Sequence, residues 1–142
     1  MEWYGKRRFG DLADEAAARF GDREGLVFQD QRYSFGDMQV EVDRAAKGLM
    51  TQGVVSGDHV ALWLNNCAEW IFISVALAKI GAVQVPINTR FRTTDLEYVI
   101  RQSDSAFLIT HDTSGPIDYL DMVRQVFALP EMGNDIDDGN FP

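Results

Sequence analysis

The sequence predicts an α/β fold: a partial doubly wound sheet with three parallel strands at about 60–65, 83–87 and 106–110, flanking helices and an N-terminal hairpin at about 26–35. One pattern in the sequence supports this prediction. Short apolar runs of strand length alternate with segments of helical period between residues 60 and 110. Such alternation indicates a parallel sheet with right-handed crossovers, because each helix must bury its apolar stripe against the sheet.

The first part of the chain is expected to hold a helix and a hairpin. Apolar residues recur at helical spacing over residues 9–20, and Gly21 ends the pattern. Two β-prone runs, 26–29 and 32–35, then flank Asp30 and Gln31. Two short strands separated by such a pair predict a β-hairpin, although this pair is not a typical hairpin turn.

Residue pairs with capping-box spacing predict where the following helices begin. The pairs are Ser34 and Asp37, Asn66 and Glu69, and Thr94 and Glu97. The first of these helices should end near Gly53 and the second, a buried helix, at Gly81, because glycine commonly follows the last residue of a helix. A further amphipathic helix should begin at Pro116, since proline suits the first helical position.

The apolar runs locate the expected core. Residues 60–64 are continuously apolar, as expected for a parallel strand that is covered on both faces. Residues 70–78 are also apolar, but they fall far short of the roughly 20 residues that a membrane-spanning helix needs. We therefore expect a buried helix and no membrane span, with Leu62 and Trp70 both deeply buried.

Composition and charge limit the class of protein. A chain of 142 residues with 46% hydrophobic and 25% charged residues is expected to form one globular domain. Its formal net charge of −9 argues against a general nucleic-acid or anionic-membrane binder, because such a surface needs clustered cations. The single cysteine and the lack of an apolar stretch after the three cations at residues 6–8 favour a cytoplasmic protein.

Motifs that would assign a chemistry are absent or have simpler interpretations. The sequence contains neither Gly-x-Gly-x-x-Gly after a strand nor a Walker phosphate loop. His59 and His111 are the only histidines and neither stands in a Cys/His cluster, so no metal site is predicted. The helix dipole could make Cys67 nucleophilic, but a small buried apolar side chain is the simpler interpretation. No catalytic residue is predicted.

Four motifs follow one another in a recognisable order. They are residues 33–38, 53–62, 65–70 and 76–90. In this order they resemble the opening of the adenylate-forming acyl-CoA synthetases, and the first and last resemble two early core motifs of that superfamily. Residues 95–110 continue in the same register, so that the resemblance covers about residues 9–128.

The resemblance implies an enzyme that uses ATP and magnesium to convert a small-molecule carboxylic acid into an acyl-adenylate, then transfers the acyl group to coenzyme A, as in fatty acid metabolism. The family's phosphate loop, its adenine and ribose motifs and its catalytic lysine have no counterpart in this sequence. We therefore expect residues 1–129 to be the front portion of the large N-terminal domain, and residues 130–142 to be a disordered acidic tail. None of the family's cofactors should bind this chain tightly.

One binding residue is implied by the resemblance. Residues 88–90 lie beyond the carboxyl end of a predicted parallel strand, where open α/β sheets usually place ligands. Arg90 matches an arginine that in some family members lies toward the phosphates of coenzyme A, and a planar guanidinium can bind phosphate bidentately. Alternatively, Arg90 is an ordinary exposed arginine. Arg92 and Arg101 could join it in a basic patch.

Two functional hypotheses remain open. The chain is either an inactive piece of an acyl-CoA synthetase or a small stand-alone α/β module that serves as a binding or protein-interaction domain. In both cases a sheet of three strands would expose an edge that is prone to self-association.

Overall fold

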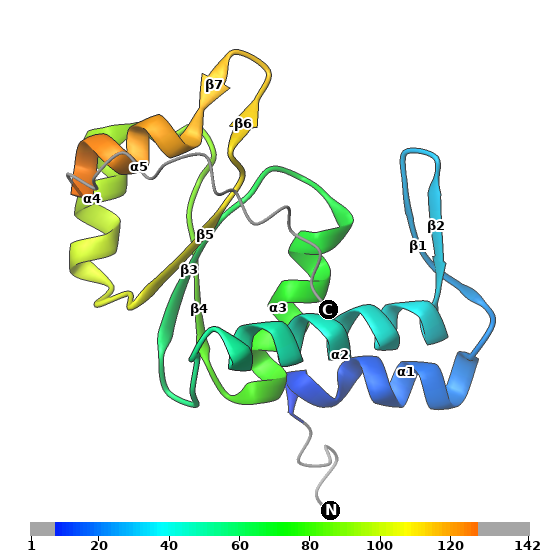
Figure 1. Ribbon diagram of the computed structural model, residues 1–142. Helices are drawn as coiled ribbons and strands as arrows, with labels where there is room; N and C mark the ends of the chain where they lie inside the picture. The colour runs from blue at the N-terminus through cyan, green and yellow to red at the C-terminus, as the bar shows by residue number, and fades with distance from the viewer. Residues whose placement is uncertain (1–7, 128–142) are drawn as a thin grey trace, which may run out of the picture. The chain divides into compact units, whose positions relative to one another are not determined.

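The computed structural model of the chain describes residues 8–127 (Figure 1). The predicted tail at 130–142 lies outside these residues. The described elements, in chain order, are the 3-10 helix η1 (Phe9–Asp11), α1 (Leu12–Phe20), β1 (Glu24–Phe28), β2 (Gln31–Ser34), α2 (Phe35–Thr51), β3 (His59–Trp63), α3 (Ala68–Ile80), β4 (Val83–Pro86), α4 (Thr93–Gln102), β5 (Phe107–Thr110), β6 (Thr113–Ser114), β7 (Ile117–Asp118) and α5 (Tyr119–Phe127).

The chain forms two compact units. The first comprises the residues up to Gly57 together with Cys67–Val83, and the second comprises Asp58–Asn66 together with the residues from Gln84 onward. The first unit therefore contains η1, α1, α2, α3 and the β1–β2 hairpin, whereas the three-stranded sheet, α4, α5 and the β6–β7 hairpin belong to the second, with Val83 of β4 at the division.

Small side chains line the contacts between the helices of the first unit. Helix α2 packs against both α1 and α3 (Figure 1). The buried cluster at these contacts contains Ala13, Val42, Ala46, Ala68, Phe72, Val75 and Ala76. Alanine at a helix contact permits a close approach of the two backbones, because the distance between helix axes depends on the side chains between them.

The hairpin is present, but its turn lies one residue earlier than predicted. β1 and β2 are antiparallel, and Phe28 is opposite Gln31, so Gln29 and Asp30 form the turn. Gln29 adopts a φ of 53°, which is uncommon for a residue other than glycine and which the sequence did not signal. The hairpin is held to its unit by Tyr33, whose ring packs edge-on against that of Phe72 with centroids 5.1 Å apart.

The capping box at Ser34 is confirmed. Ser34 Oγ accepts a hydrogen bond from the backbone N–H of Asp37 at 3.0 Å, and Asp37 Oδ2 accepts one from the Ser34 N–H at 2.9 Å. Helix α2 then ends at Thr51, close to the predicted end at Gly53. The reciprocal bonds satisfy N–H groups that have no partner within the helix.

The other predicted helix starts are wrong. Helix α3 begins at Ala68 after Cys67, which makes no side-chain capping bond, so the pair Asn66 and Glu69 does not cap it. Helix α4 begins one residue before Thr94, and the carboxylate that meets its capping position is that of Asp95, which accepts from the Arg92 N–H at 3.2 Å. Polar residues are frequent near both starts, so sequence spacing alone could not choose between adjacent alternatives.

The predicted helix start at Pro116 is also wrong, because Gly115 and Pro116 form the turn between β6 and β7. Gly115 has a φ of 57°, which favours glycine at this turn. Helix α5 begins only at Tyr119, and Asp118 Oδ1 accepts a hydrogen bond from the Asp121 N–H at 2.8 Å. Asp118, which directly precedes the helix and accepts this bond, marks its start, whereas Pro116 lies in the preceding turn.

The predicted parallel sheet is confirmed. The strands lie in the order β4-β3-β5 (Figure 1). Val60 of β3 is opposite Phe107 of β5. The central strand β3 is buried from Val60 to Trp63. Ala61 and Trp63, two residues apart on one face, share a buried cluster with Leu96, Ile100, Tyr119 and Val123 of α4 and α5. This period of two places the two helices on the same face of the sheet.

Helix α3 is short as well as apolar. It has 13 residues, and Phe72, Val75, Ala76 and Leu77 are buried, as expected for a core helix. Trp70 is only partly buried, so the prediction of deep burial holds for Leu62, which is 0% exposed, and not for Trp70. No helix within residues 8–127 has the length and apolar character needed to cross a membrane.

Candidate functional site

The segments after β3, β4 and β5 meet at one edge of the sheet in the second unit. Because the strands are parallel, their carboxyl ends lie at the same edge, and this edge is the usual ligand site of open α/β sheets. The segments that follow the strands contain Asn65, Asn88, Arg90 and His111. This edge is the candidate site.

Asn88 organises the turn after β4. Its backbone carbonyl accepts two hydrogen bonds, from Trp63 Nε1 at 3.1 Å and from the Phe91 N–H at 3.0 Å. Its side-chain Oδ1 accepts a third, from the Arg90 N–H at 2.9 Å. The segment also stays paired with β3, since the Ile87 N–H donates to the Leu62 carbonyl at 3.0 Å. The backbone around Arg90 is therefore fixed on the sheet.

Arg90 is exposed, and its guanidinium has no hydrogen-bond or ion-pair partner among residues 8–127. The two other arginines considered from the sequence differ from it. Arg92 Nη1 donates to the carbonyl oxygens of Phe91 at 2.8 Å and Thr89 at 3.3 Å. Arg101 Nη2 lies 2.9 Å from Glu97 Oε1 in an ion pair along α4. Of the three guanidinium groups, only that of Arg90 is available to an anion without breaking a contact.

Asn65 was not predicted from the sequence as a site residue. Its Nδ2 donates to Ser114 Oγ at 2.6 Å, and its Oδ1 accepts from the Tyr119 hydroxyl at 3.3 Å. The Tyr119 ring packs edge-on against Trp63, with centroids 4.6 Å apart. Asn65 thus links the end of β3 to the β6–β7 hairpin and the start of α5. Its position directly beyond a buried strand was the only signal in the sequence.

The histidines do not form a site. His59 begins β3 and His111 follows β5, so the parallel register separates them by the length of the paired strands. His59 Nδ1 lies 2.5 Å from the Ser103 carbonyl oxygen, so this ring nitrogen already has a hydrogen-bond partner. Within the described residues there is no group of three or more His, Cys, Asp or Glu side chains that could hold a metal ion.

Cys67, in the first unit, is not set up as a nucleophile. Burial raises the pKa of its thiol, and the neighbouring Glu69 carboxylate acts in the same direction. A raised pKa reduces the fraction of thiolate at neutral pH, and the thiolate is the reactive form. The side chain is partly buried, which agrees better with the structural interpretation than with the nucleophilic one.

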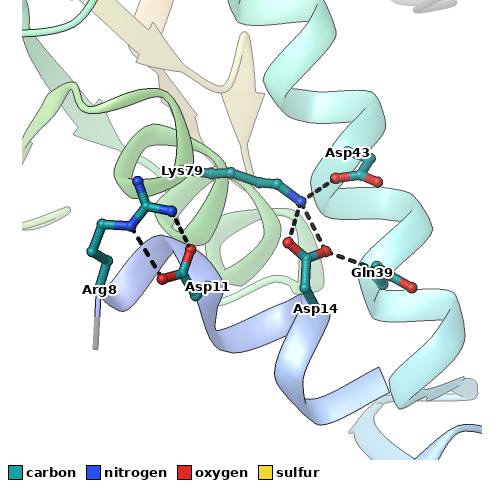
Figure 2. Close-up of polar contacts among 6 residues, drawn as sticks. All are labelled: Arg8, Asp11, Asp14, Gln39, Asp43 and Lys79. Atoms are coloured by element: carbon teal, nitrogen blue, oxygen red, sulfur yellow. Dashed lines mark hydrogen bonds and ion pairs between the residues drawn. The ribbon is translucent and has the colours of Figure 1, made fainter. Parts of the chain in front are cut away.

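A cluster of charged residues in the first unit is structural (Figure 2). Lys79 Nζ lies 2.8 Å from Asp14 Oδ2 and 2.5 Å from Asp43 Oδ1, and Gln39 Nε2 donates to Asp14 Oδ1 at 2.8 Å. These residues come from α1, α2 and α3, so the cluster ties the three helices together. A second ion pair, between Arg8 and Asp11 of η1, is separate and exposed.

The Lys79 ammonium is fully charged at neutral pH. Burial alone would lower the pKa of Lys79, but the hydrogen bonds that its ammonium donates to Asp14 and then to Asp43 outweigh burial and raise it. The hydrogen bond from Lys79 is in turn the main reason why the pKa of Asp14 is lowered. A charged, doubly paired ammonium is neither a base nor a nucleophile. Lys79 is therefore not a candidate catalytic lysine.

Comparison with known proteins identifies the family of this chain. The family model described as AMP-binding enzyme matches residues 13–138. The Bacillus subtilis (strain 168) protein YngI, which carries the name of an acyl-CoA synthetase, is 38% identical over 125 residues, or 87% of this chain and 22% of that protein. Crotonobetaine/carnitine–CoA ligase of Proteus mirabilis (strain HI4320) is 34% identical over 122 residues, or 82% of this chain and 24% of the ligase.

The fold agrees with solved structures of the same kind. The crystal structure of the N-terminal domain of FACL13 from Mycobacterium tuberculosis superposes with a TM-score of 0.76 at 29% sequence identity. The match covers 83% of this chain and 30% of that chain. The present chain spans less than a quarter of the two curated relatives, with shares of 22% and 24%. It therefore belongs to the AMP-binding enzyme family and corresponds to an N-terminal segment of an AMP-forming ligase.

Proposed function

We propose that this chain is the front part of an acyl-CoA synthetase whose whole length activates a carboxylic acid with ATP and transfers the acyl group to coenzyme A. The family match over residues 13–138 carries this proposal. Its relatives are named for ligases of different acids, so the acid is proposed only as a small carboxylic acid, with fatty acid metabolism as its setting and the cytoplasm as its location. Cell fractionation tests the location.

We further propose that the chain has no turnover by itself. Adenylate formation needs a cradle for the ATP phosphates, a cation partner and a metal held by carboxylates. The sequence has no glycine-rich phosphate loop, and its only lysines are Lys6, Lys47 and Lys79. Lys79 is held by two carboxylates. Losing groups that act together removes most of a rate rather than a share of it.

Release of pyrophosphate from ATP tests this proposal. The purified chain is assayed with short, long and aromatic acids, with and without coenzyme A and magnesium, and no release above background is expected. Turnover that survives repurification and disappears when a residue of this chain is replaced would overturn it.

Within the whole enzyme, we propose that Arg90 binds a phosphate group of coenzyme A. Three observations support this role. The guanidinium is exposed, and it has no partner among the described residues. It also follows a strand at the carboxyl edge of a parallel sheet. A planar guanidinium with free donors suits phosphate because two of its N–H groups can bind two oxygens at once.

Replacement of Arg90 by alanine tests this role. Coenzyme A is titrated into the chain and followed by NMR, which detects binding in the millimolar range. The matched control is Arg101→Ala, which removes an exposed arginine that already pairs with Glu97. Only Arg90→Ala should weaken binding, and added salt should weaken binding to the parent chain, because the contact is an ion pair with phosphate. Equal affinity in Arg90→Ala would remove Arg90 from the site.

We also propose that the isolated chain self-associates through β5. This strand is the last in the order β4-β3-β5 among the described strands. Its sequence, Phe107–Thr110, contains no charged residue and no proline, and these are the usual devices that protect a sheet edge. The opposite edge strand, β4, ends in Pro86, which cannot donate a backbone hydrogen bond.

A further inference from the structure

Asn88 binds the backbone N–H of Arg90, and Arg92 Nη1 also donates to the carbonyl oxygens of Thr89 and Phe91 in the same turn. The Asn88 carbonyl accepts from Phe91, which closes a turn over residues 88–91, and its side-chain oxygen accepts from the Arg90 N–H inside that turn. An asparagine side chain that bonds to the backbone two residues ahead fixes a local turn without help from a regular element. Among the described residues, the Arg90 guanidinium contributes nothing to holding this backbone, because it has no partner there.

Trp63 anchors the same turn to the sheet. Its side chain is 0% exposed and packs against Tyr119 at a centroid distance of 4.6 Å. Its indole N–H donates to the Asn88 carbonyl at 3.1 Å. A buried indole donor that lost this acceptor would be left unsatisfied, so the position of the Asn88 carbonyl is strongly constrained. The turn is thereby tied to the central strand β3.

We infer that Asn88 is a positioning residue for Arg90. Together with Trp63, Asn88 fixes the backbone from which the free guanidinium of Arg90 reaches a phosphate group of the ligand. This inference rests on the proposed function of Arg90 as a coenzyme A contact. Asn88 touches no ligand atom in this role. Asn88 restricts the backbone of Arg90 before the ligand binds, so less conformational entropy is lost on binding. Such preorganisation strengthens binding without any new contact.

Two variants at Asn88 separate positioning from packing. Asn88→Ala removes Oδ1 and keeps the backbone carbonyl that Trp63 needs. Asn88→Asp keeps an acceptor for the Arg90 N–H but adds a negative charge beside the site. The matched control is Asn66→Ala, because Asn66 is also an exposed asparagine just beyond a strand of this sheet and makes no side-chain contact among the described residues.

Two quantities are measured by NMR on the full chain: the exchange rate of the Arg90 amide hydrogen, and the dissociation constants of coenzyme A and of adenosine 3′,5′-bisphosphate. We expect Asn88→Ala to speed the exchange of the Arg90 amide hydrogen. The same variant should weaken the binding of both ligands about three- to tenfold, which corresponds to the cost of ordering one more flexible group on binding. Asn66→Ala should change neither quantity.

Asn88→Asp should give a different pattern. The Arg90 amide should stay protected because its acceptor remains, whereas affinity should fall at low salt and return toward the parent value at high salt, where repulsion between the new carboxylate and phosphate is screened. The retained protection of the Arg90 amide, rather than the salt effect, is the result that separates Asn88→Asp from Asn88→Ala and assigns the positioning to the Oδ1 acceptor.

The outcomes distinguish the two proposals. If Arg90→Ala weakens binding and Asn88→Ala does not, positioning by Asn88 is wrong while the proposed role of Arg90 stands. Faster exchange of the Arg90 amide with unchanged affinity also overturns the inference. If the parent chain binds neither ligand, or if Arg90→Ala binds as the parent does, the proposed role of Arg90 fails and the inference fails with it.

Discussion

Lys79 and Asp14 form a contact whose contribution to stability depends on pH. Because the pKa of Lys79 is raised in the folded chain, its ion pairs contribute fully to stability below the pKa of a lysine in the unfolded chain, about 10.4. This contribution is lost as the pH rises through the pKa that Lys79 has in the folded chain. The lowered pKa of Asp14 means that its contribution is present above the unfolded value of about 3.9 and is lost as pH falls through the folded pKa. The cluster therefore stabilises the first unit between these limits.

Replacing Lys79 by methionine tests this pH range. We expect a loss of about 1 kcal/mol or less at neutral pH, because Asp14 and Asp43 are more than a third exposed and solvent screens the pair. The loss should shrink at acid pH, as Asp14 becomes protonated in both states. Urea unfolding of both proteins across pH measures it. Lys47→Met is the control, and a difference that is the same at pH 3 and pH 7 would contradict the assignment.

Leu62 and Trp70 form a second test at the residue scale. Leu62 is 0% exposed in the central strand, so Leu62→Ala should cost about 2–5 kcal/mol. Trp70 is only partly buried, so Trp70→Ala should cost clearly less. Thermal and urea unfolding of the two variants give the comparison. If Trp70→Ala is as damaging as Leu62→Ala, the burial described for α3 is wrong.

At the scale of elements, η1 and α3 approach each other at Gly10. A Cβ atom at this position would lie 2.5 Å from the Lys79 Cα and 2.7 Å from the Ala78 carbonyl oxygen. Both are backbone atoms, so the clash cannot be relieved by a rotation of a side chain. The small size of Gly10, rather than its freedom of φ, is what permits this contact.

Gly10→Ala is therefore expected to destabilise the chain by about 3 kcal/mol, as η1 separates from α3. Gly36→Ala is the matched control, because a Cβ there would meet nothing closer than 3.6 Å and alanine favours the helix α2 in which it lies. Urea unfolding should show a large loss for the first variant and none for the second. Similar stability of the two variants would refute the close contact.

Element type was better predicted from sequence than element boundaries. The apolar run at β3 and the glycine that ends α3 are strong signals, because a strand buried on both faces and a left-handed residue each admit few residue types. The starts of α3, α4 and α5 were wrongly assigned. Several neighbouring polar residues could cap each helix, and the choice among them depends on where the preceding loop leaves the sheet.

At the scale of the whole molecule, self-association is expected to depend on concentration. Sedimentation velocity over a dilution series should show dimers or larger species that dissociate on dilution, since an unprotected strand edge offers unpaired N–H and C=O groups. The chain carries a formal net charge of −9, so lowering the salt should oppose association by increasing repulsion. A single monomeric species at every concentration would refute the proposed pairing through β5.

The sequence by itself determined the fold class, the family and the position of Arg90 after a strand. These follow from local patterns: apolar runs, their alternation with helices and the order of short motifs. Only the tertiary structure decided that Arg92 and Arg101 already have partners, that Arg90 has none among the described residues, and that Asn88 and Trp63 hold its backbone. The physical reason is that a hydrogen bond depends on the distance and direction between two groups, which residue spacing does not fix even for the near neighbours of Arg90, Arg92 and Arg101. The contact of Trp63 with Asn88 in addition depends on strand pairing, which brings together residues 25 positions apart.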